Sequence, residues 1–230
     1  MQFVKKRRKV EPMQDSYKAI YTGGTGEIIE KKSRFIATIQ PIASEEEAIA
    51  FIEQQKKKYW DASHNCSAYV LGRNHELERC SDDGEPSKTA GRPMLDVLLN
   101  EGIHNTVAVV TRYFGGTLLG TGGLVRAYQG AVKEGLNHCV IIEKKYAKQI
   151  KITTDYNGLG KIQYIAATKN LTTINTEFTD IVMITLLVPQ DEEGSLLKKV
   201  QEATNGKATI EFLDCAYYAN INGEIELFES

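Results

Sequence analysis

The second half of the sequence runs through strand-like and helix-like segments in a single order. Alternating apolar residues predict strands, and apolar residues three and four positions apart predict helices. The order is strand, helix, strand, strand, helix, strand, which is typical of a ferredoxin-like sandwich. The six segments are residues 147–154, 158–169, 172–178, 181–188, 191–204 and 208–216. We therefore expect a ferredoxin-like α+β domain over residues 139–220.

The first half also mixes strands and helices. Residues 19–22 and 27–42 are strand-like, and Gly23-Gly24-Thr25-Gly26 between them predicts a hairpin turn, because glycine tolerates positive φ. Ser44 followed by Glu47 is a capping box, which predicts that a helix begins here. The later segments are a strand over 66–71, a helix from Pro93 to Gly102, a strand over 106–114 and a helix over 124–137.

Composition and charge limit the class of protein. Of the 230 residues, 42% are hydrophobic and 25% are charged, which is typical of a globular chain. The net charge of −2 excludes a wholly cationic nucleic-acid coat but leaves room for a local basic patch. Basic residues fill positions 5–9, so we expect a solvated basic tail over residues 1–15, with an arm for nucleic acid or an anionic membrane as the alternative.

Several other classes lack support in the sequence. There is no run of about 18 apolar residues, so we expect no membrane-spanning helix. Residues 1–12 hold no apolar stretch long enough for a signal peptide. The four cysteines, at 66, 80, 139 and 215, include no CxxC pair, so zinc-ribbon spacing is absent. We expect a cytoplasmic protein with reduced thiols and without metal, cofactor or membrane association.

A glycine-rich loop at residues 115–123 lies between a predicted strand and a predicted helix. Free N–H groups and the dipole at a helix N-terminus suit phosphate, and Arg112 and Arg126 flank the loop. The P-loop pattern fails because Thr121 and Gly122 replace its Lys and Ser/Thr, and the dinucleotide pattern fails at Val125. The alternative to an anion or nucleic-acid contact is a tight turn that needs glycine for its backbone.

Three carboxylates occur within four residues, at Asp82, Asp83 and Glu85. Such a group can hold Mg²⁺ or act as acid and base, although EF-hand spacing is absent. The favoured interpretation is an acidic turn that holds backbone amides or a nearby arginine. His64 and Cys66 lie two residues apart on one strand face, so a Cys/His catalytic pair is a further alternative. A zinc deaminase is not supported, because neither HxE nor PCxxC is present.

Three blocks, taken together, resemble the IMPACT/YigZ family. They are His64-Asn65-Cys66-Ser67-Ala68-Tyr69, Asp82 to Pro93, and Arg112 to Tyr128. The resemblance is strong over residues 16–136, and the remainder resembles the smaller C-terminal domain of bacterial members. It implies a domain like domain 2 of ribosomal protein S5 over residues 16–138, followed by the ferredoxin-like domain. Both domains resemble parts of elongation factor G.

The resemblance implies binding of RNA or the ribosome by a non-enzymatic protein connected with translation regulation. Eukaryotic relatives regulate translation through a protein partner and lack the C-terminal half. Leu118 stands where many members carry lysine, and Lys88 where many carry glycine, so Lys88 is a candidate replacement contact. The candidate anion- or nucleic-acid-binding residues are Lys88, Arg92, Arg112, Tyr113, Gly115, Gly116, Gly120, Gly122, Gly123 and Arg126.

Two alternative functions remain from the sequence. One is a protein-interaction adaptor, which requires an exposed apolar patch or sheet edge. The other is a hydrolase of a small substrate, with His64, Asp83 and Glu85 as weak catalytic candidates beside the glycine-rich loop. The hydrolase requires that the three blocks meet around one pocket.

Overall fold

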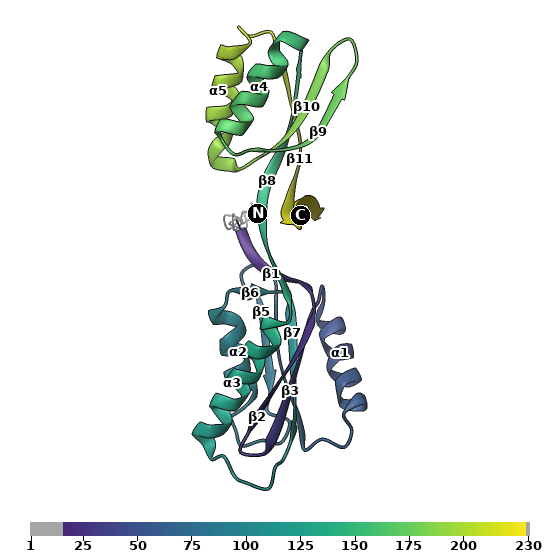
Figure 1. The fold of residues 1–230 in the computed structure, drawn as a ribbon, viewed down its shortest axis with the longest axis vertical. Coiled ribbons are helices and arrows are strands. Elements are labelled where there is room, and N and C mark those ends of the chain that lie inside the picture. The colour runs from purple at the N-terminus through teal and green to yellow at the C-terminus, as the bar shows by residue number, and fades with distance from the viewer. Residues whose placement is uncertain (1–15, 229–230) are drawn as a thin grey trace, which may run out of the picture. The chain divides into compact units, whose positions relative to one another are not determined.

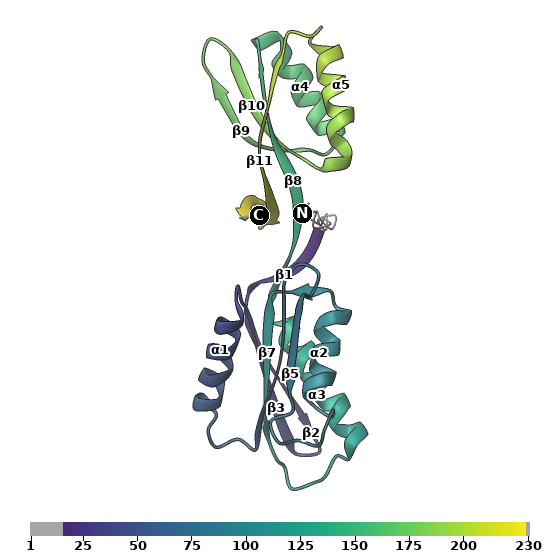
Figure 2. The same cartoon turned by 180° about the vertical axis from the view of Figure 1, so that it is seen from behind.

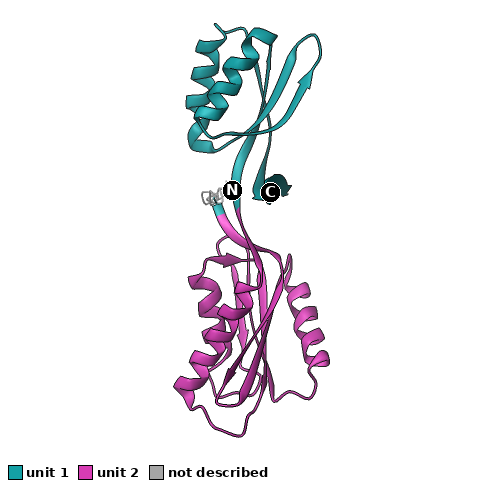
Figure 3. Cartoon of the chain, viewed as in Figure 1, with its two compact units in different colours: residues 1–16, 144–230 teal, residues 17–143 magenta. Residues whose placement is uncertain are grey.

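The computed structural model describes residues 16–228, so the expected basic tail at residues 1–15 lies outside the described part of the chain. The chain divides into two compact units, drawn in magenta and teal in Figure 3. The N-terminal unit comprises residues 17–143. The C-terminal unit comprises residues from Lys144 onward together with Ser16. The domain boundary expected after residue 138 stays a prediction.

The N-terminal unit is built on a five-stranded sheet in which every described pairing is antiparallel. A separate short parallel pairing joins β1 (Ser16–Thr22) to β6 (Ile103–His104). The sheet strands, in their spatial order, are β2 (Gly24–Glu30), β3 (Ser33–Pro41), β7 (Thr106–Tyr113), β4 (His64–Leu71) and β5 (Leu77–Ser81).

The hairpin turn expected at residues 23–26 is wrong. Residues 24–30 form strand β2, and the turn to β3 lies at Lys31 and Lys32, whose φ angles are 45° and 66°. The glycines serve helix packing instead. A Cβ atom on Gly26 would stand 2.6 Å from the backbone of Glu134 in α3, so glycine lets this helix lie directly on the strand.

Helices cover both faces of this sheet (Figures 1 and 2). Helix α1 (Glu45–Lys58) packs on one face through Ala48 and Phe51. Helices α2 (Gly91–Asn100) and α3 (Thr121–Asn137) pack on the other face, which holds the larger core. The sheet is therefore the middle of three layers, and its central strands β3, β7 and β4 are mostly buried.

Local signals explain where α1 begins. The Ser44 hydroxyl accepts a hydrogen bond from the Glu47 N–H at 3.3 Å, and the Glu47 carboxylate accepts one from the Ala43 N–H at 2.7 Å. The expected capping box is therefore confirmed. Helix α3 begins at Thr121, three residues before the predicted start, with Gly120 as its N-cap at a φ of 71°.

The C-terminal unit confirms the β-α-β-β-α-β order. Strand β8 lies between β11 and β10, and β9 pairs with the other side of β10. Helices α4 and α5 lie side by side on one face of this sheet (Figure 1), over a core centred on Ile150, Ile162 and Leu196. The added β12 forms a hairpin with β11 that was not expected. The elements are β8 (Val140–Thr154), α4 (Tyr156–Thr168), β9 (Thr172–Phe178), β10 (Val182–Val188), a 3-10 turn η1 (Gln190–Glu192), α5 (Glu193–Ala203), β11 (Thr209–Ile221) and β12 (Glu224–Phe228).

Candidate functional site

The three sequence blocks meet at one end of the N-terminal sheet. His64 begins β4 and is the direct cross-strand neighbour of Arg112 near the end of β7. The segment after β5 brings Glu85 to the same place. Between them lies a pocket of about 470 Å³, also lined by Phe114, by Pro86 and by the loop that leads into α3. The three blocks therefore converge on one pocket, which is the condition that the hydrolase hypothesis sets.

The floor of this pocket is a buried ion pair. Nη1 of Arg112 lies 2.6 Å from Oε1 of Glu85, and both side chains are buried, with 7% and 3% of their surface exposed. The hydroxyl of Tyr128, from the middle of α3, donates to the same Oε1 at 2.8 Å. Three segments are therefore held together by one carboxylate oxygen.

Arg112 also organises the start of the glycine-rich loop. Its guanidinium lies between the rings of Phe35 and Phe114, at 5.4 and 5.5 Å from their centroids. Nη2 donates to the Ser33 hydroxyl at 3.5 Å, and that hydroxyl also accepts from the Gly115 N–H at 3.1 Å. Arg112 was predicted to contact an anion directly; here its guanidinium is turned to the interior, and direct contact stays a prediction.

His64 presents its outer ring nitrogen to the pocket. Nδ1 lies 2.8 Å from the carbonyl oxygen of Asp83, and since that oxygen only accepts, Nδ1 carries the proton. When the ring carries a single proton, Nε2 is therefore an acceptor, and it lies 3.9 Å from Oε2 of Glu85. Within residues 16–228, no side chain or backbone N–H donates to that Oε2. Two acceptors therefore face the same space.

The two aspartates serve the local fold. Oδ2 of Asp83 accepts from the Asn65 N–H at 2.7 Å, and Oδ1 pairs with Lys56 at 3.1 Å. Asp82 accepts from the backbone N–H groups of Lys88, Ala90 and Gly91, at 2.8, 3.1 and 2.8 Å. The favoured interpretation, an acidic turn that holds backbone amides, describes this arrangement. In the described part of the chain, no group of three acidic, histidine or cysteine side chains is placed to hold a metal ion.

Cys66 lies beneath the pocket and is unsuited to nucleophilic attack. Its thiol donates to the carbonyl oxygen of Asp82 at 3.0 Å and lies 3.3 Å from the hydroxyl of Tyr128. Burial raises the pKa of this thiol well above its usual value, and the neighbouring Glu85 carboxylate acts in the same direction. The thiolate is therefore disfavoured, and the geometry does not support a Cys66–His64 pair.

Most of the loop glycines have a local structural reason. A Cβ atom on Gly115 would clash with the backbone of Lys32, and Gly116 and Gly120 have φ angles of 80° and 71°. Gly122 and Gly123 lie in the first turn of α3, where no side chain caps the helix and no acidic residue is present. The positive end of α3 is therefore open to an anion, although the glycines themselves are explained by turn geometry.

The predicted cations differ in what they contact. Arg92 pairs with Asp96 at 2.7 Å on the surface of α2. Arg126 and Lys88 are exposed, and neither has a carboxylate partner among residues 16–228. Arg126 lines a hollow of about 220 Å³ with Lys31, while Glu30 supplies the acidic group there.

Sequence reasoning missed the residues that surround these cations. Lys31 and Lys32 form the β2–β3 turn, and the backbone of Lys32 lies directly against Gly115. Trp60 is 82% exposed in the segment after α1, and Phe114 is 49% exposed. That segment adjoins the glycine-rich loop, because the Phe114 N–H donates to the Ser63 hydroxyl at 3.3 Å. An exposed tryptophan gives no periodic signal, so only the fold could place it here.

Tyr113, another predicted contact, is partly buried and locally bonded. Its hydroxyl donates to the Asp61 carboxylate at 2.8 Å, and the Arg34 guanidinium lies 5.9 Å from its ring centroid. The hydrogen bond ties the end of β7 to the segment that carries Trp60. A role of Tyr113 in nucleic-acid contact stays a prediction.

Comparison with known proteins identifies the family. The chain is 42% identical over 205 residues to the IMPACT family member YvyE of Bacillus subtilis, which covers 89% of this chain and 94% of that protein. This chain belongs to the IMPACT family. Residues 31–136 match the family model of the Impact N-terminal domain, which contains every pocket residue named above, and residues 152–207 match a domain of unknown function, DUF1949.

Other IMPACT proteins and one solved structure are also similar to this chain. The family member YigZ of Escherichia coli is 35% identical over 178 residues, covering 76% of this chain and 87% of that one. The Protein IMPACT homolog of Dictyostelium discoideum is 40% identical over 105 residues, covering 44% of this chain and 29% of that one. A solved structure titled as that of an hypothetical protein is 32% identical, with a TM-score of 0.55, covering 87% of this chain and 98% of that one. The comparisons contain no signal of an enzyme.

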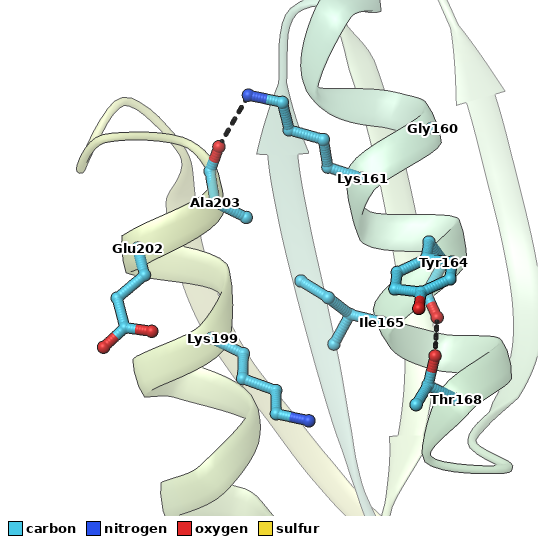
Figure 4. Close-up of a pocket in the computed structure, with 8 residues that line it drawn as sticks. All are labelled: Gly160, Lys161, Tyr164, Ile165, Thr168, Lys199, Glu202 and Ala203. Atoms are coloured by element: carbon cyan, nitrogen blue, oxygen red, sulfur yellow. Dashed lines mark hydrogen bonds between the residues drawn. The ribbon is translucent and has the colours of Figure 1, made fainter.

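The C-terminal unit of this IMPACT protein has a hollow of its own. A groove of about 660 Å³ lies between α4 and α5 (Figure 4). Lys161 spans it and donates to the carbonyl oxygen of Ala203 at 2.8 Å, while Tyr164 and Lys199 lie along its walls. The surface that lines it is mainly apolar. Across residues 16–228, no helix combines the length and apolar character needed to cross a membrane.

Proposed function

We propose that this protein binds single-stranded RNA, free or on the ribosome, and acts without catalysing a reaction. The binding surface is the loop end of the N-terminal unit, defined as residues 30–32, 59–63, 114–123 and Arg126. One observation carries the proposal: exposed cations and exposed aromatic rings gather here, whereas the nearby buried acids are already neutralised or hydrogen-bonded.

The cations supply attraction for phosphate. Lys31, Lys32 and Arg126 are exposed and have no carboxylate partner among the described residues. The uncapped end of α3 adds a positive dipole beside them. With about four phosphate contacts at about −0.7 each, the log–log dependence of the binding constant on salt has a slope of about −3.

The aromatic side chains suit unpaired bases. Trp60 and Phe114 offer ring faces to solvent at the two adjoining segments of the loop end. Stacking of a base on such a ring contributes about 1–3 kcal/mol and tolerates any sequence. A rigid sheet beneath the loops fixes the spacing of rings and cations, so RNA finds a surface that needs little reordering.

The link to translation rests on resemblance. Membership of the IMPACT family is shown, and the family resemblance implies two domains similar to parts of elongation factor G. Likeness of fold supports a ribosomal target only by analogy, since function depends on the site. We therefore extend the proposal to translation regulation in the cytoplasm through the ribosome, and the test includes ribosomes beside free RNA.

The test is a salt series with a matched control. Wild type, the triple variant Lys31→Ala, Lys32→Ala, Arg126→Ala and the control triple Lys133→Ala, Lys198→Ala, Lys207→Ala are compared. All six side chains are exposed, so both triples lose the same charge. Anisotropy with labelled single-stranded RNA and co-sedimentation with ribosomes should show salt-sensitive binding that only the loop-end triple loses. Equal binding by both triples contradicts the surface, and no binding by wild type at low salt contradicts the function.

A hydrolase is the second candidate, and one observation favours it. His64 and Glu85 line a common pocket, with Nε2 and Oε2 separated by 3.9 Å. Asp83, the third expected group, is bound to Lys56 and Asn65 and is unavailable. A small chromogenic phosphate ester tests this candidate: turnover by wild type that His64→Ala abolishes would support it, whereas no turnover by wild type speaks against hydrolysis of phosphate esters.

A further inference from the structure

We propose that the pocket of about 470 Å³ in the N-terminal unit holds one unstacked nucleobase that carries an exocyclic amino group, and therefore selects cytosine, adenine or guanine over uracil. This inference deepens the proposed function and rests on it. It concerns the pocket behind the loop end, where the polar groups include Glu85 and His64 rather than the exposed cations.

The hydrogen-bonding character of the pocket selects donors. Oε2 of Glu85 receives no hydrogen bond from residues 16–228, while Oε1 receives those of Arg112 and Tyr128. In the singly protonated ring, Nε2 of His64 is an acceptor, because Nδ1 donates to the Asp83 carbonyl. A ligand that displaces water from these acceptors must therefore offer N–H groups, since a carboxylate oxygen that is desolvated without a new donor costs free energy.

The separation of the two acceptors suits a single amino group. Oε2 and Nε2 are 3.9 Å apart. One nitrogen with two hydrogens about 2.9 Å from each acceptor spans acceptors up to about 5 Å apart. The amino group of cytosine can therefore reach both atoms. Uracil has a carbonyl oxygen at the same position, which would face two acceptors and leave them unsatisfied.

The lining of the pocket favours a flat, neutral ring. Leu119, Leu124, Pro86 and Phe114 form apolar walls around the polar pair. The volume is in the range of ordinary small-ligand sites, about 300–1,000 Å³. An ammonium ligand is disfavoured, because the Arg112 guanidinium already neutralises Glu85 and the positive end of α3 borders the same space.

The acceptors are held in place before any ligand arrives. The Glu85 side chain is 3% exposed and fixed by Arg112 and Tyr128, and His64 is fixed by the Asp83 carbonyl. Fixed polar groups discriminate strongly between ligands, because they cannot move to find other hydrogen-bond partners when a ligand lacks the matching donor. A base in the pocket also places its phosphate near the exposed end of α3.

The experiment compares two RNAs that differ in one base. The probes are a nonamer of uridines and the same nonamer with cytidine at its centre, titrated by anisotropy at low salt. Wild type should bind the cytidine RNA about tenfold more tightly, which corresponds to about 1.4 kcal/mol. His64→Leu removes one acceptor and leaves the Glu85–Arg112–Tyr128 cluster in place, so the preference should fall below about threefold while affinity for the uridine RNA is kept.

The second variant is Glu85→Gln, in which the amide presents an N–H donor to the pocket in place of the Oε2 acceptor. Circular dichroism reports whether this variant folds. If it folds, it should also lose the preference for cytidine. Equal binding of both RNAs by wild type overturns the pocket assignment and leaves the proposed function standing. A cytidine preference that survives in His64→Leu overturns it as well, because the selection would then arise elsewhere. Binding of neither RNA overturns the proposed function together with this inference.

Discussion

Arg112 and Glu85 form a 2.6 Å ion pair that is almost fully buried beneath the glycine-rich loop. The pair joins β7, which ends at Tyr113, to the segment between β5 and α2. Tyr128 ties α3 to the same carboxylate at 2.8 Å. A site assembled from three segments of distant sequence is therefore held by one charge pair, and the position of the pocket depends on it.

Removal of one partner of this pair should destabilise the fold strongly. Arg112→Ala or Glu85→Ala leaves a buried charge without its counterion, which costs about 3–5 kcal/mol. Urea denaturation measures the loss in the free energy of unfolding. The control is Arg92→Ala, which opens the exposed pair with Asp96 and should cost less than about 1 kcal/mol. Equal losses at Arg112 and Arg92 would show that the buried pair does not support the fold.

The cysteines should differ in reactivity in the native protein. Burial raises the pKa of Cys66, whose side chain is enclosed under the pocket, whereas Cys80 is exposed. The pKa of Cys80 is also raised by partial burial, but its sulfur is accessible. Alkylation at pH 8 followed by peptide mapping should label Cys80 first and Cys66 only after unfolding. Rapid labelling of Cys66 in the folded protein would contradict its inert role.

His104 should make stability fall in mild acid. Its ring is buried and stacked on His75 at 4.0 Å, and burial lowers its pKa below the usual 6.5. The unfolded chain therefore takes up a proton first, so the contribution of His104 is complete above about pH 6.5 and is lost as pH falls through the lowered folded value.

The measurement is the free energy of unfolding between pH 7.5 and 5.5 for wild type and His104→Gln. The variant is less stable at pH 7.5 because it loses packing against Tyr17 and His75. Its stability should depend less on pH than that of wild type. Parallel curves for the two proteins would show that another group causes the acid sensitivity.

Periodic signals in the sequence predicted much of the fold. The β-α-β-β-α-β order follows from alternating and helical spacing, and Ser44 with Glu47 marks the start of α1. Such signals are local, because each depends only on residues that lie a few positions apart in the sequence. The strand β5 was missed because LERCS has no clear apolar alternation, and the hairpin strand β12 was missed although Ile225 and Leu227 alternate with glutamates.

The site was predictable only in part. The sequence left open whether the three blocks meet, because their contacts depend on tertiary structure. The sequence does not show that Asp82 bonds three backbone amides or that Arg112 points inward. Likewise, glycine suggests a turn wherever it occurs. At Gly26 the requirement is instead the close approach of α3, which no local pattern reports.

Gly26 should not tolerate a side chain. In Gly26→Ala the new Cβ atom would stand 2.6 Å from the backbone of Glu134, so α3 must shift from β2. We expect a loss of about 1–3 kcal/mol in the free energy of unfolding, as for other overpacked positions. The control is Gly160→Ala in α4, where nothing lies within 4 Å of the added atom. That change should stabilise the helix by about 0.5–1 kcal/mol, so losses in both variants would contradict the packing argument.

A double substitution in the β2–β3 turn should raise the stability of the protein and lower its affinity for RNA. Lys31 and Lys32 both have positive φ, 45° and 66°, as in a type I′ turn, which asparagine and glycine adopt with less strain. The double variant Lys31→Asn, Lys32→Gly should therefore stabilise the protein by about 1 kcal/mol in urea denaturation. It also removes two exposed cations, so RNA affinity should fall and the salt slope should flatten by about 1.4, at about 0.7 per phosphate contact. A variant that gains stability yet binds RNA as wild type does would place the RNA-binding surface away from this turn.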